Sequence, residues 1–206
     1  MPELFDAIKQ RRSIRKLQQN PVSNKLVVKV LEAAGWAPSA HNSQPWRFIV
    51  ISSAEVKRTL AEAIVEAWAE DLKRDGVVIE ENTRKERLDR YTNAPVLILA
   101  CSTMEGLRKY PDQQRQSFER DLAIQSLGAS LQNLLLTAHK LGLGCCWFSA
   151  PGFCKETVRQ VLKIPRTVEP EAFIILGYPA EKPPVPPRKS LSEFCFTDKW
   201  GRDFKI

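Results

Sequence analysis

The chain has 206 residues, 43% of them hydrophobic, so it is long enough to bury a sizeable core. Its 31 Lys and Arg against 24 Asp and Glu give a formal charge of +7, which favours anionic partners such as nucleic acid or a phosphorylated cofactor. Apolar runs fall short of the roughly 20 residues of a membrane span, and five cysteines without a CxxC or CxxH pair suggest neither a disulfide framework nor a zinc site.

The first fifty residues predict two helices and a strand. An apolar stripe over the opening residues indicates a short amphipathic helix that ends at a basic cluster beginning with Arg11. Ser23 is typical of a helix N-cap, and the apolar stripe after it must end before Pro38. The run WRFIVI at 46–51 is rich in β-forming residues and predicts a buried strand.

The next segment predicts helix and strand again. Residues 54–74 carry one apolar face, and Gly76 follows as a stop signal. Residues 77–90 are so charged that they can bury little, so we expect a solvated helix or a mobile lid there. PVLILAC at 95–101 predicts a second buried strand.

The longest periodic segment runs from 117 to 141 and ends at Gly142, which predicts a central helix. Its small residues would let another helix approach closely. That approach is either ordinary packing within the chain or a dimer contact. The residues concerned are Ala123, Gly128, Ala129 and Ser130.

The last third predicts a strand at 145–150, a helix at 155–162 and a strand at 172–176. A proline-rich stretch then forces an extended chain, and the tail beyond it is too short to form a core of its own. Its aromatic residues need a surface, either on a partner subunit or on the same subunit. They are Phe194, Phe196, Trp200 and Phe204.

Two segments carry the chemistry. RRSIR at 11–15 gathers three guanidinium groups and a hydroxyl, which suits a phosphate ester, although basic residues at a helix C-terminus also complement the helix dipole. PSAHNSQPW at 38–46 is a polar loop leading into a strand. Such a loop can recognise the polar edge of a ring, or its Asn and Ser can simply bond their own backbone.

Taken together, these segments resemble the FMN-dependent nitroreductase family. The resemblance continues through LGLGCCWFSAP at 141–151, LGYP at 176–179 and a basic pair near the C-terminus, so it covers essentially the whole chain. It implies one FMN-binding domain over 1–206. The implied fold is α+β, with three αβα layers, a central mixed sheet and a C-terminal tail swapped between the subunits of a homodimer.

The resemblance also implies roles for individual residues. Arg11, Ser13 and Arg188 would hold the FMN phosphate, Arg12 would help in the same region, and Arg15 would approach the pyrimidine edge of the flavin. A cation at that edge would stabilise the negative charge left by reduction. The loop residues would come from the opposite subunit, and the last two residues of the 145–150 strand would bring backbone groups near the hydride-accepting nitrogen. These are Pro38, Ser39, Ala40 and Asn42, and Ser149 and Ala150.

The chain departs from the family pattern at two places. Pro186 stands where many relatives carry a lysine, so Lys189 would substitute for it or the phosphate would have one partner fewer. Ser149 and Ala150 replace a common Glu-Gly pair. The middle region is more similar to the nitroreductase-like domain of deazaflavin-biosynthesis proteins, which makes a deazaflavin precursor an alternative substrate and a reduced deazaflavin an alternative donor to NAD(P)H.

We therefore expect a cytoplasmic enzyme in which ping-pong hydride transfer from NAD(P)H or a reduced deazaflavin serves a nitroaromatic, quinone or related acceptor. The flavin does the chemistry, so no side chain is assigned as a catalyst, and no metal is expected. His41 is a candidate substrate contact, and the adjacent Cys145 and Cys146 are expected to be buried packing residues. The remote alternative is a non-catalytic flavin- or nucleic-acid-binding protein, but the basic residues are mostly interspersed with acids.

Overall fold

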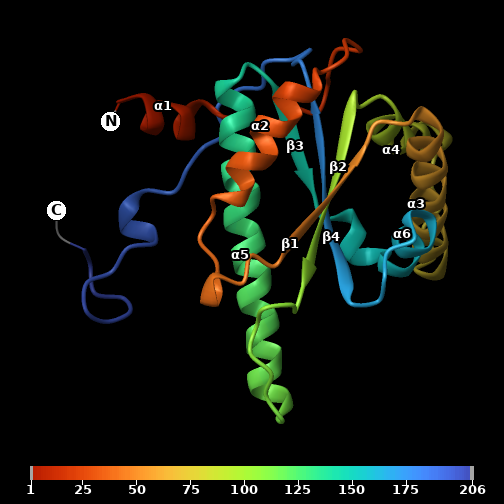
Figure 1. Cartoon of the computed structure of the whole chain (residues 1–206). Coiled ribbons are helices and arrows are strands. Elements are labelled where there is room, and N and C mark those ends of the chain that lie inside the picture. The colour runs from red at the N-terminus through yellow and green to blue at the C-terminus, as the bar shows by residue number, and fades with distance from the viewer. Residues whose placement is uncertain (1, 205–206) are drawn as a thin grey trace.

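The computed structural model describes residues 2–204, whose helices and strands form three layers (Figure 1). The helices are α1 (Pro2–Gln10), α2 (Asn24–Gly35), α3 (Ala54–Arg74), α4 (Glu81–Thr92), α5 (Gln113–Lys140) and α6 (Lys155–Leu162). The strands are β1 (Trp46–Ile51), β2 (Val96–Thr103), β3 (Gly144–Phe148) and β4 (Val168–Gly177). Short 3₁₀ turns cover Ala40–Asn42 (η1), Ala150–Phe153 (η2) and Leu191–Glu193 (η3).

The sheet lies between two helical layers, as expected for an αβα fold. One apolar cluster joins one face of the sheet to α2 and α5, and a second joins the other face to α3, α4 and α6. Residues of β2 alternate between the two clusters, and the whole strand is buried. This is why its sequence reads as a continuous apolar run rather than as an alternating pattern.

The expectation of a mixed sheet is corrected by the strand pairing. The order is β1-β2-β4-β3, and each neighbouring pair of these strands is antiparallel. The strands joined by α5, β2 and β3, do run parallel to each other, but β4 lies between them. The parallel contact that the described residues retain is a single bridge from Ser13 to Cys145 on the β3 edge.

Close packing of α2 on α5 accounts for part of the small-residue stripe. The Ser130 hydroxyl donates to the carbonyl of Ala34 at 2.9 Å, and both residues are fully buried. Gly128 and Ala129 are only partly buried, so their role in a dimer contact stays a prediction.

The charged segment at 77–90 contains the start of α4, which packs on α3. Arg84 pairs with Glu66, and the Arg87 guanidinium lies 3.7 Å above the ring of Trp68. Tyr91 anchors the end of α4 in the core, with its ring 5.6 Å from that of Phe173. The helix thus buries little but is held at both ends.

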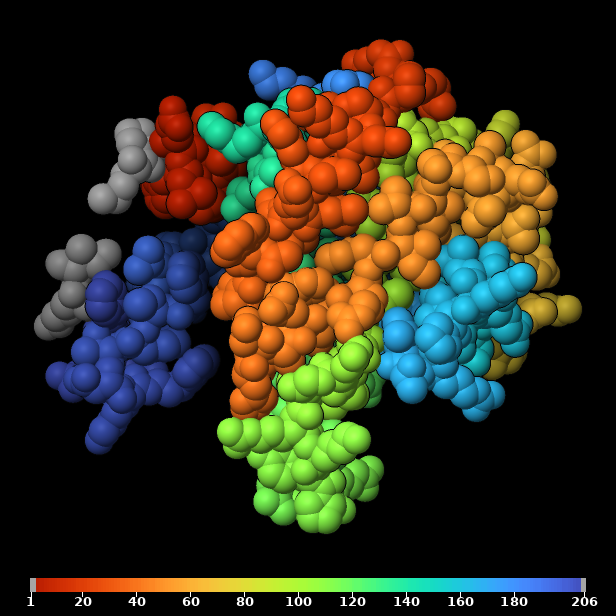
Figure 2. Space-filling view, viewed as in Figure 1, coloured from red at the N-terminus to blue at the C-terminus, as the bar shows by residue number. Residues whose placement is uncertain are grey.

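The first helix and the tail lie beside the body of the molecule, where Figure 2 shows the tail as a separate blue mass next to the red α1. Phe194 and Trp200 of the tail are 60% and 91% exposed, and the apolar face of α1 is open as well. Packing on the same subunit therefore does not cover these side chains. Within residues 2–204, no helix is both long and apolar enough to cross a membrane.

Candidate functional site

The basic segment runs along the outer edge of β3. The Ile14 amide donates to the Cys145 carbonyl at 2.9 Å, next to the bridge between Ser13 and Cys145. A Cβ built on Gly144 would come within 2.9 Å of the Ile14 side chain. The segment can approach the strand this closely because the strand begins with glycine.

Three expected phosphate and flavin contacts lie near the middle of β3. Burial raises the pKa of the Cys146 thiol, whereas Arg15, the Ser13 hydroxyl, Arg90 and Arg11 lower it. Arg11 lowers the pKa of the neighbouring Cys145 as well. Arg12 turns back instead, and its guanidinium donates to the carbonyls of Lys9 at 2.6 Å and of Arg11 at 2.7 Å. Capping α1 is the alternative role for a basic residue at this place.

A return segment after β4 fastens the basic segment in position. Glu181 accepts the backbone N–H groups of Arg15 at 2.6 Å and Lys16 at 3.1 Å, and these bonds hold the pKa of Glu181 below its usual value. Beside it lies a cavity of about 520 Å³, whose lining includes Arg12 and His139. No local sequence pattern predicts this role for Glu181, because Arg15, whose amide it accepts, lies 166 residues away in the chain.

The adjacent cysteines are packing residues, as expected. Cys145 faces the α5 side of the sheet and Cys146 the α3 side, and both are buried. Burial raises the pKa of Cys145 to about 12, so the sulfur is a thiol and not a nucleophilic thiolate at neutral pH. Among the described residues, no group of His, Cys, Asp and Glu could hold a metal ion.

Ser149 and Ala150 follow directly after β3, on the same edge as the basic segment. At the usual rise per residue of a strand, the Cα atoms of Cys146 and Ser149 are about 10 Å apart. Ser149 is exposed, and its carbonyl accepts the Gly152 amide at 3.1 Å in a tight turn. The structure thus brings these two residues and Arg11–Arg15 to one edge of the sheet.

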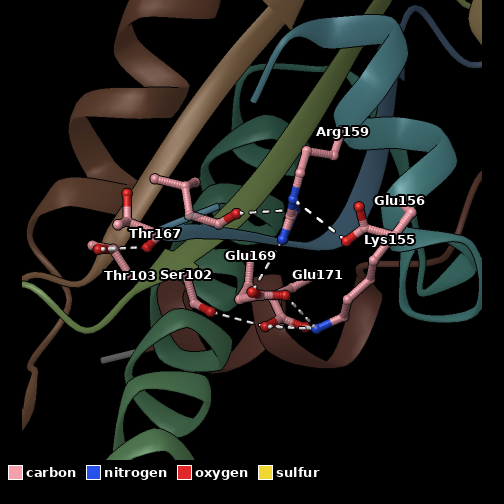
Figure 3. A network of polar contacts seen from close by, with 9 residues as sticks. Ser102, Thr103, Lys155, Glu156, Arg159, Thr167, Glu169 and Glu171 are labelled. Atoms are coloured by element: carbon pink, nitrogen blue, oxygen red, sulfur yellow. Dashed lines mark hydrogen bonds and ion pairs between the residues drawn. The ribbon is translucent and has the colours of Figure 1, made fainter. Parts of the chain in front are cut away.

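The same turn leads into α6, where a polar network ties the helix to β4 (Figure 3). Lys155 lies 3.3 Å from both Glu169 and Glu171, and Glu171 also accepts the Ser102 hydroxyl at 2.8 Å. Arg159, almost fully buried, contacts Glu169 at 3.1 Å. The network holds the start of α6, and with it the end of the turn, against the sheet.

This network predicts loss of stability in acid. Burial raises the pKa of Glu169, but the hydrogen bonds from Lys155 and Arg159 outweigh it and leave the pKa below its ordinary value of 4.5. A depressed carboxylate pKa contributes stability above the unfolded-state pKa, and that contribution is lost as pH falls through the folded-state value. We expect Glu169→Gln to lower stability at pH 7 and to flatten the decline below about pH 4.5.

Urea unfolding of both proteins at a series of pH values checks this. Glu156→Gln is the matched control, because Glu156 lies 3.6 Å from Arg159 but its side chain is 69% exposed. An acid decline as steep in Glu169→Gln as in the parent would refute the role given to Glu169.

The polar loop before β1 is held on α5. The Ala40 amide donates to the Ser126 hydroxyl at 3.2 Å, and the Gln44 amide to the Ser39 hydroxyl at 3.0 Å. His41 lies 3.4 Å from Glu119, whose side chain is only 5% exposed. His41, Asn42 and Gln44 all have positive φ, so this loop is strained. The loop thus bonds its own backbone, and its contacts with α5 also hold it in one defined conformation.

The two halves of the expected site lie apart in one chain. The loop precedes β1, and the basic segment borders β3. These two strands form opposite edges of the sheet and are three strand spacings, or about 14 Å, apart. Along α5, Ser126 beside the loop and His139 beside Arg11 are separated by about 20 Å. One chain therefore does not close a site between these segments.

Arg188 and Lys189 lie in the exposed tail. Within residues 2–204, neither side chain makes an ion pair or hydrogen bond. The structure thus leaves both cations available and does not bring them onto the basic segment.

Known proteins resemble this chain over most of its length. The family model described as "Nitroreductase family" matches residues 8–178. A protein of Methanothermobacter thermautotrophicus named "Putative NADH dehydrogenase/NAD(P)H nitroreductase" is 34% identical, over 88% of this chain and 80% of that protein.

Solved structures agree. A BluB-like flavoprotein from Clostridium difficile is 28% identical with a TM-score of 0.77, covering 95% of this chain and 99% of that one. A structure titled "putative nitroreductase in complex with fmn", from Desulfovibrio desulfuricans, is 27% identical with a TM-score of 0.71, covering 96% and 97%.

Proposed function

Since the chain belongs to the nitroreductase family and is thus an oxidoreductase, we propose that it binds FMN and works by a ping-pong mechanism. A reduced nicotinamide or a reduced deazaflavin would give up hydride and leave. A nitroaromatic, quinone or related acceptor would then enter and be reduced. When bound, FMN supplies the hydride chemistry.

The observation that carries the proposal is a set of cations without counter-ions along β3. Among residues 2–204, no carboxylate lies within 4 Å of the guanidinium groups of Arg11 or Arg15, while that of Arg12 bonds backbone carbonyls. The nearby carboxylate of Glu181 bonds backbone amides instead. A phosphate ester with nearly two negative charges and three acceptor oxygens fits this set.

Individual residues take the roles that the family resemblance implies. Arg11 and Ser13 would hold the phosphate with Arg188. Lys189 would take the role of the lysine that many relatives carry where this chain has Pro186. Arg15 would stabilise negative charge on the pyrimidine edge. Backbone groups of Ser149 and Ala150 would orient the ring. No side chain is assigned as acid or base, and water would deliver protons.

We further propose a homodimer in which the 38–42 loop of one subunit completes the site of the other. The separation of the two halves within one chain supports this. So do the open apolar faces of α1 and the tail, because large exposed apolar patches favour burial against a partner. The tail aromatics would then lie on the partner subunit.

The first test is the visible spectrum of protein purified without added cofactor. A yellow protein whose flavin band is bleached anaerobically by NADPH, NADH or reduced deazaflavin would support the proposal and identify the donor. A panel of nitroaromatics, quinones and deazaflavin precursors then identifies the acceptor. A colourless protein that also fails to take up FMN would overturn it.

Arg15→Ala is expected to weaken FMN binding about tenfold and to lower the flavin reduction potential by on the order of 30 mV, because a charge-assisted contact is lost. The backbone bonds of residue 15 to Glu181 are retained in this variant. Flavin content after dialysis and an anaerobic redox titration measure both effects. Lys73→Ala, which removes an exposed cation at the end of α3, is the control. Unchanged content and potential would refute the role.

A further inference from the structure

A second cavity, of about 540 Å³, lies between α3, α4 and the η2 turn. Its apolar walls come from Ile64, Trp68, Leu72 and Phe153, and Ala150 lines it as well. The volume is in the range of small-molecule sites. Because Ala150 belongs to the turn next to the proposed flavin site, the cavity adjoins that site.

One cation in this cavity has no counter-ion. Arg74 pairs with Asp71 and Arg84 pairs with Glu66, but among residues 2–204 no carboxylate lies within 4 Å of Arg87. The Arg87 guanidinium lies 3.7 Å from the centre of the Trp68 ring, and burial lowers the pKa of Arg87, which means that its charged form is incompletely compensated.

The other charges of the cavity do not pair with Arg87. Arg90, one turn along α4, is positive as well and adds to the positive potential at Arg87. Asp71 and Asp75 also line the cavity, but Asp71 pairs with Arg74, and Asp75 is exposed to solvent and lies more than 4 Å from the Arg87 guanidinium. The Cys154 thiol, whose pKa burial raises, is neutral. An anionic group from outside the chain would therefore be attracted to Arg87.

The side chains that form the walls indicate which class of anion fits the cavity. Beside the Arg87 guanidinium, which lies over the Trp68 ring, the cavity presents the apolar side chains of Ile64 and Leu72 and the flat Phe153 ring, which is 86% exposed. Flat apolar walls favour a planar ring, and the Arg87 guanidinium matches a carboxylate. Inorganic phosphate would leave the apolar walls uncovered.

We propose that this cavity binds an aromatic carboxylate, with its carboxylate on Arg87 and its ring between the walls of α3 and Phe153. Resting on the proposed function, the cavity would then be the acceptor subsite and would favour anionic over neutral nitroaromatics. Binding itself does not depend on the flavin.

Calorimetric titration of the purified holoprotein tests binding. We expect 2-naphthoate to bind about tenfold more tightly than 2-naphthamide, and Arg87→Gln to abolish that difference while Arg87→Lys keeps part of it. Arg84→Gln is the matched control, because Arg84 lies one turn away on the same helix and pairs with Glu66. Leu72→Trp, which fills the cavity, should weaken both ligands.

Equal binding of naphthoate to Arg87→Gln and to the parent, or no binding by a folded parent, would overturn the inference. If flavin is present, KM for 4-nitrobenzoate should rise about tenfold in Arg87→Gln, with kcat and the KM for nitrobenzene unchanged. A flavin-containing enzyme without this selectivity refutes the subsite but leaves the proposed function standing. A protein without flavin that still binds naphthoate refutes only the proposed function.

Discussion

A heterodimer with Arg11→Glu in one subunit and Ala40→Phe in the other is expected to keep about half of the parent turnover, while either homodimer is inactive. Arg11→Glu places a negative charge where the phosphate is proposed to bind, and Ala40→Phe adds bulk to the loop proposed to face the partner's flavin. If the two subunits share each site, one site of this heterodimer carries both changes and the other carries neither.

The matched control places both substitutions in one subunit and pairs it with an unmodified subunit. Every shared site then carries one change, so this heterodimer should be inactive. Two affinity tags allow each heterodimer to be purified, and steady-state turnover per dimer is measured. Sites confined to single subunits would give the reverse result, with activity in the control and none in the test protein. The two arrangements therefore give opposite outcomes.

Gly144→Ala is expected to lower the free energy of unfolding by about 1–3 kcal/mol and to reduce FMN content. The added Cβ would lie 2.9 Å from Cγ2 and 3.1 Å from Cβ of Ile14, and 3.1 Å from Leu17. Ile14 is β-branched and cannot turn its branch away freely, so the basic segment must move from β3. Ser13 and Arg15 would move with it.

Urea unfolding and the flavin-to-protein absorbance ratio measure both effects. Gly35→Ala is the control, since a Cβ there meets no atom within 4 Å and alanine favours the helix. A Gly144→Ala protein as stable and as yellow as the parent would show that the basic segment does not need its close approach to β3.

Local pattern was sufficient for the secondary structure. The strand at 46–51 and the helices at 54–74 and 155–162 have their predicted bounds, and the strand predicted at 95–101 lies within two residues of them, because side-chain period and glycine or proline stops act over one element. The central helix begins at Gln113, four residues earlier than predicted, where Asp112 caps it by accepting the Arg115 amide. The last strand is longer than its apolar run, because Glu169 and Glu171 at its start are neutralised by α6.

The order of the amino acids is therefore enough to predict the helices and strands, the family resemblance and the segments that carry charged or polar groups for binding. The strand order, the placement of Arg11, Ser13 and Arg15 on the β3 edge, and the separation of that edge from the 38–42 loop follow from the packing of the whole chain. This packing also brings together partners that no local pattern reports, such as Arg15 with Glu181 and His41 with Glu119. The physical reason is range: periodicity and capping act over a few residues, whereas hydrogen bonds and ion pairs between distant segments exist only after the chain has packed.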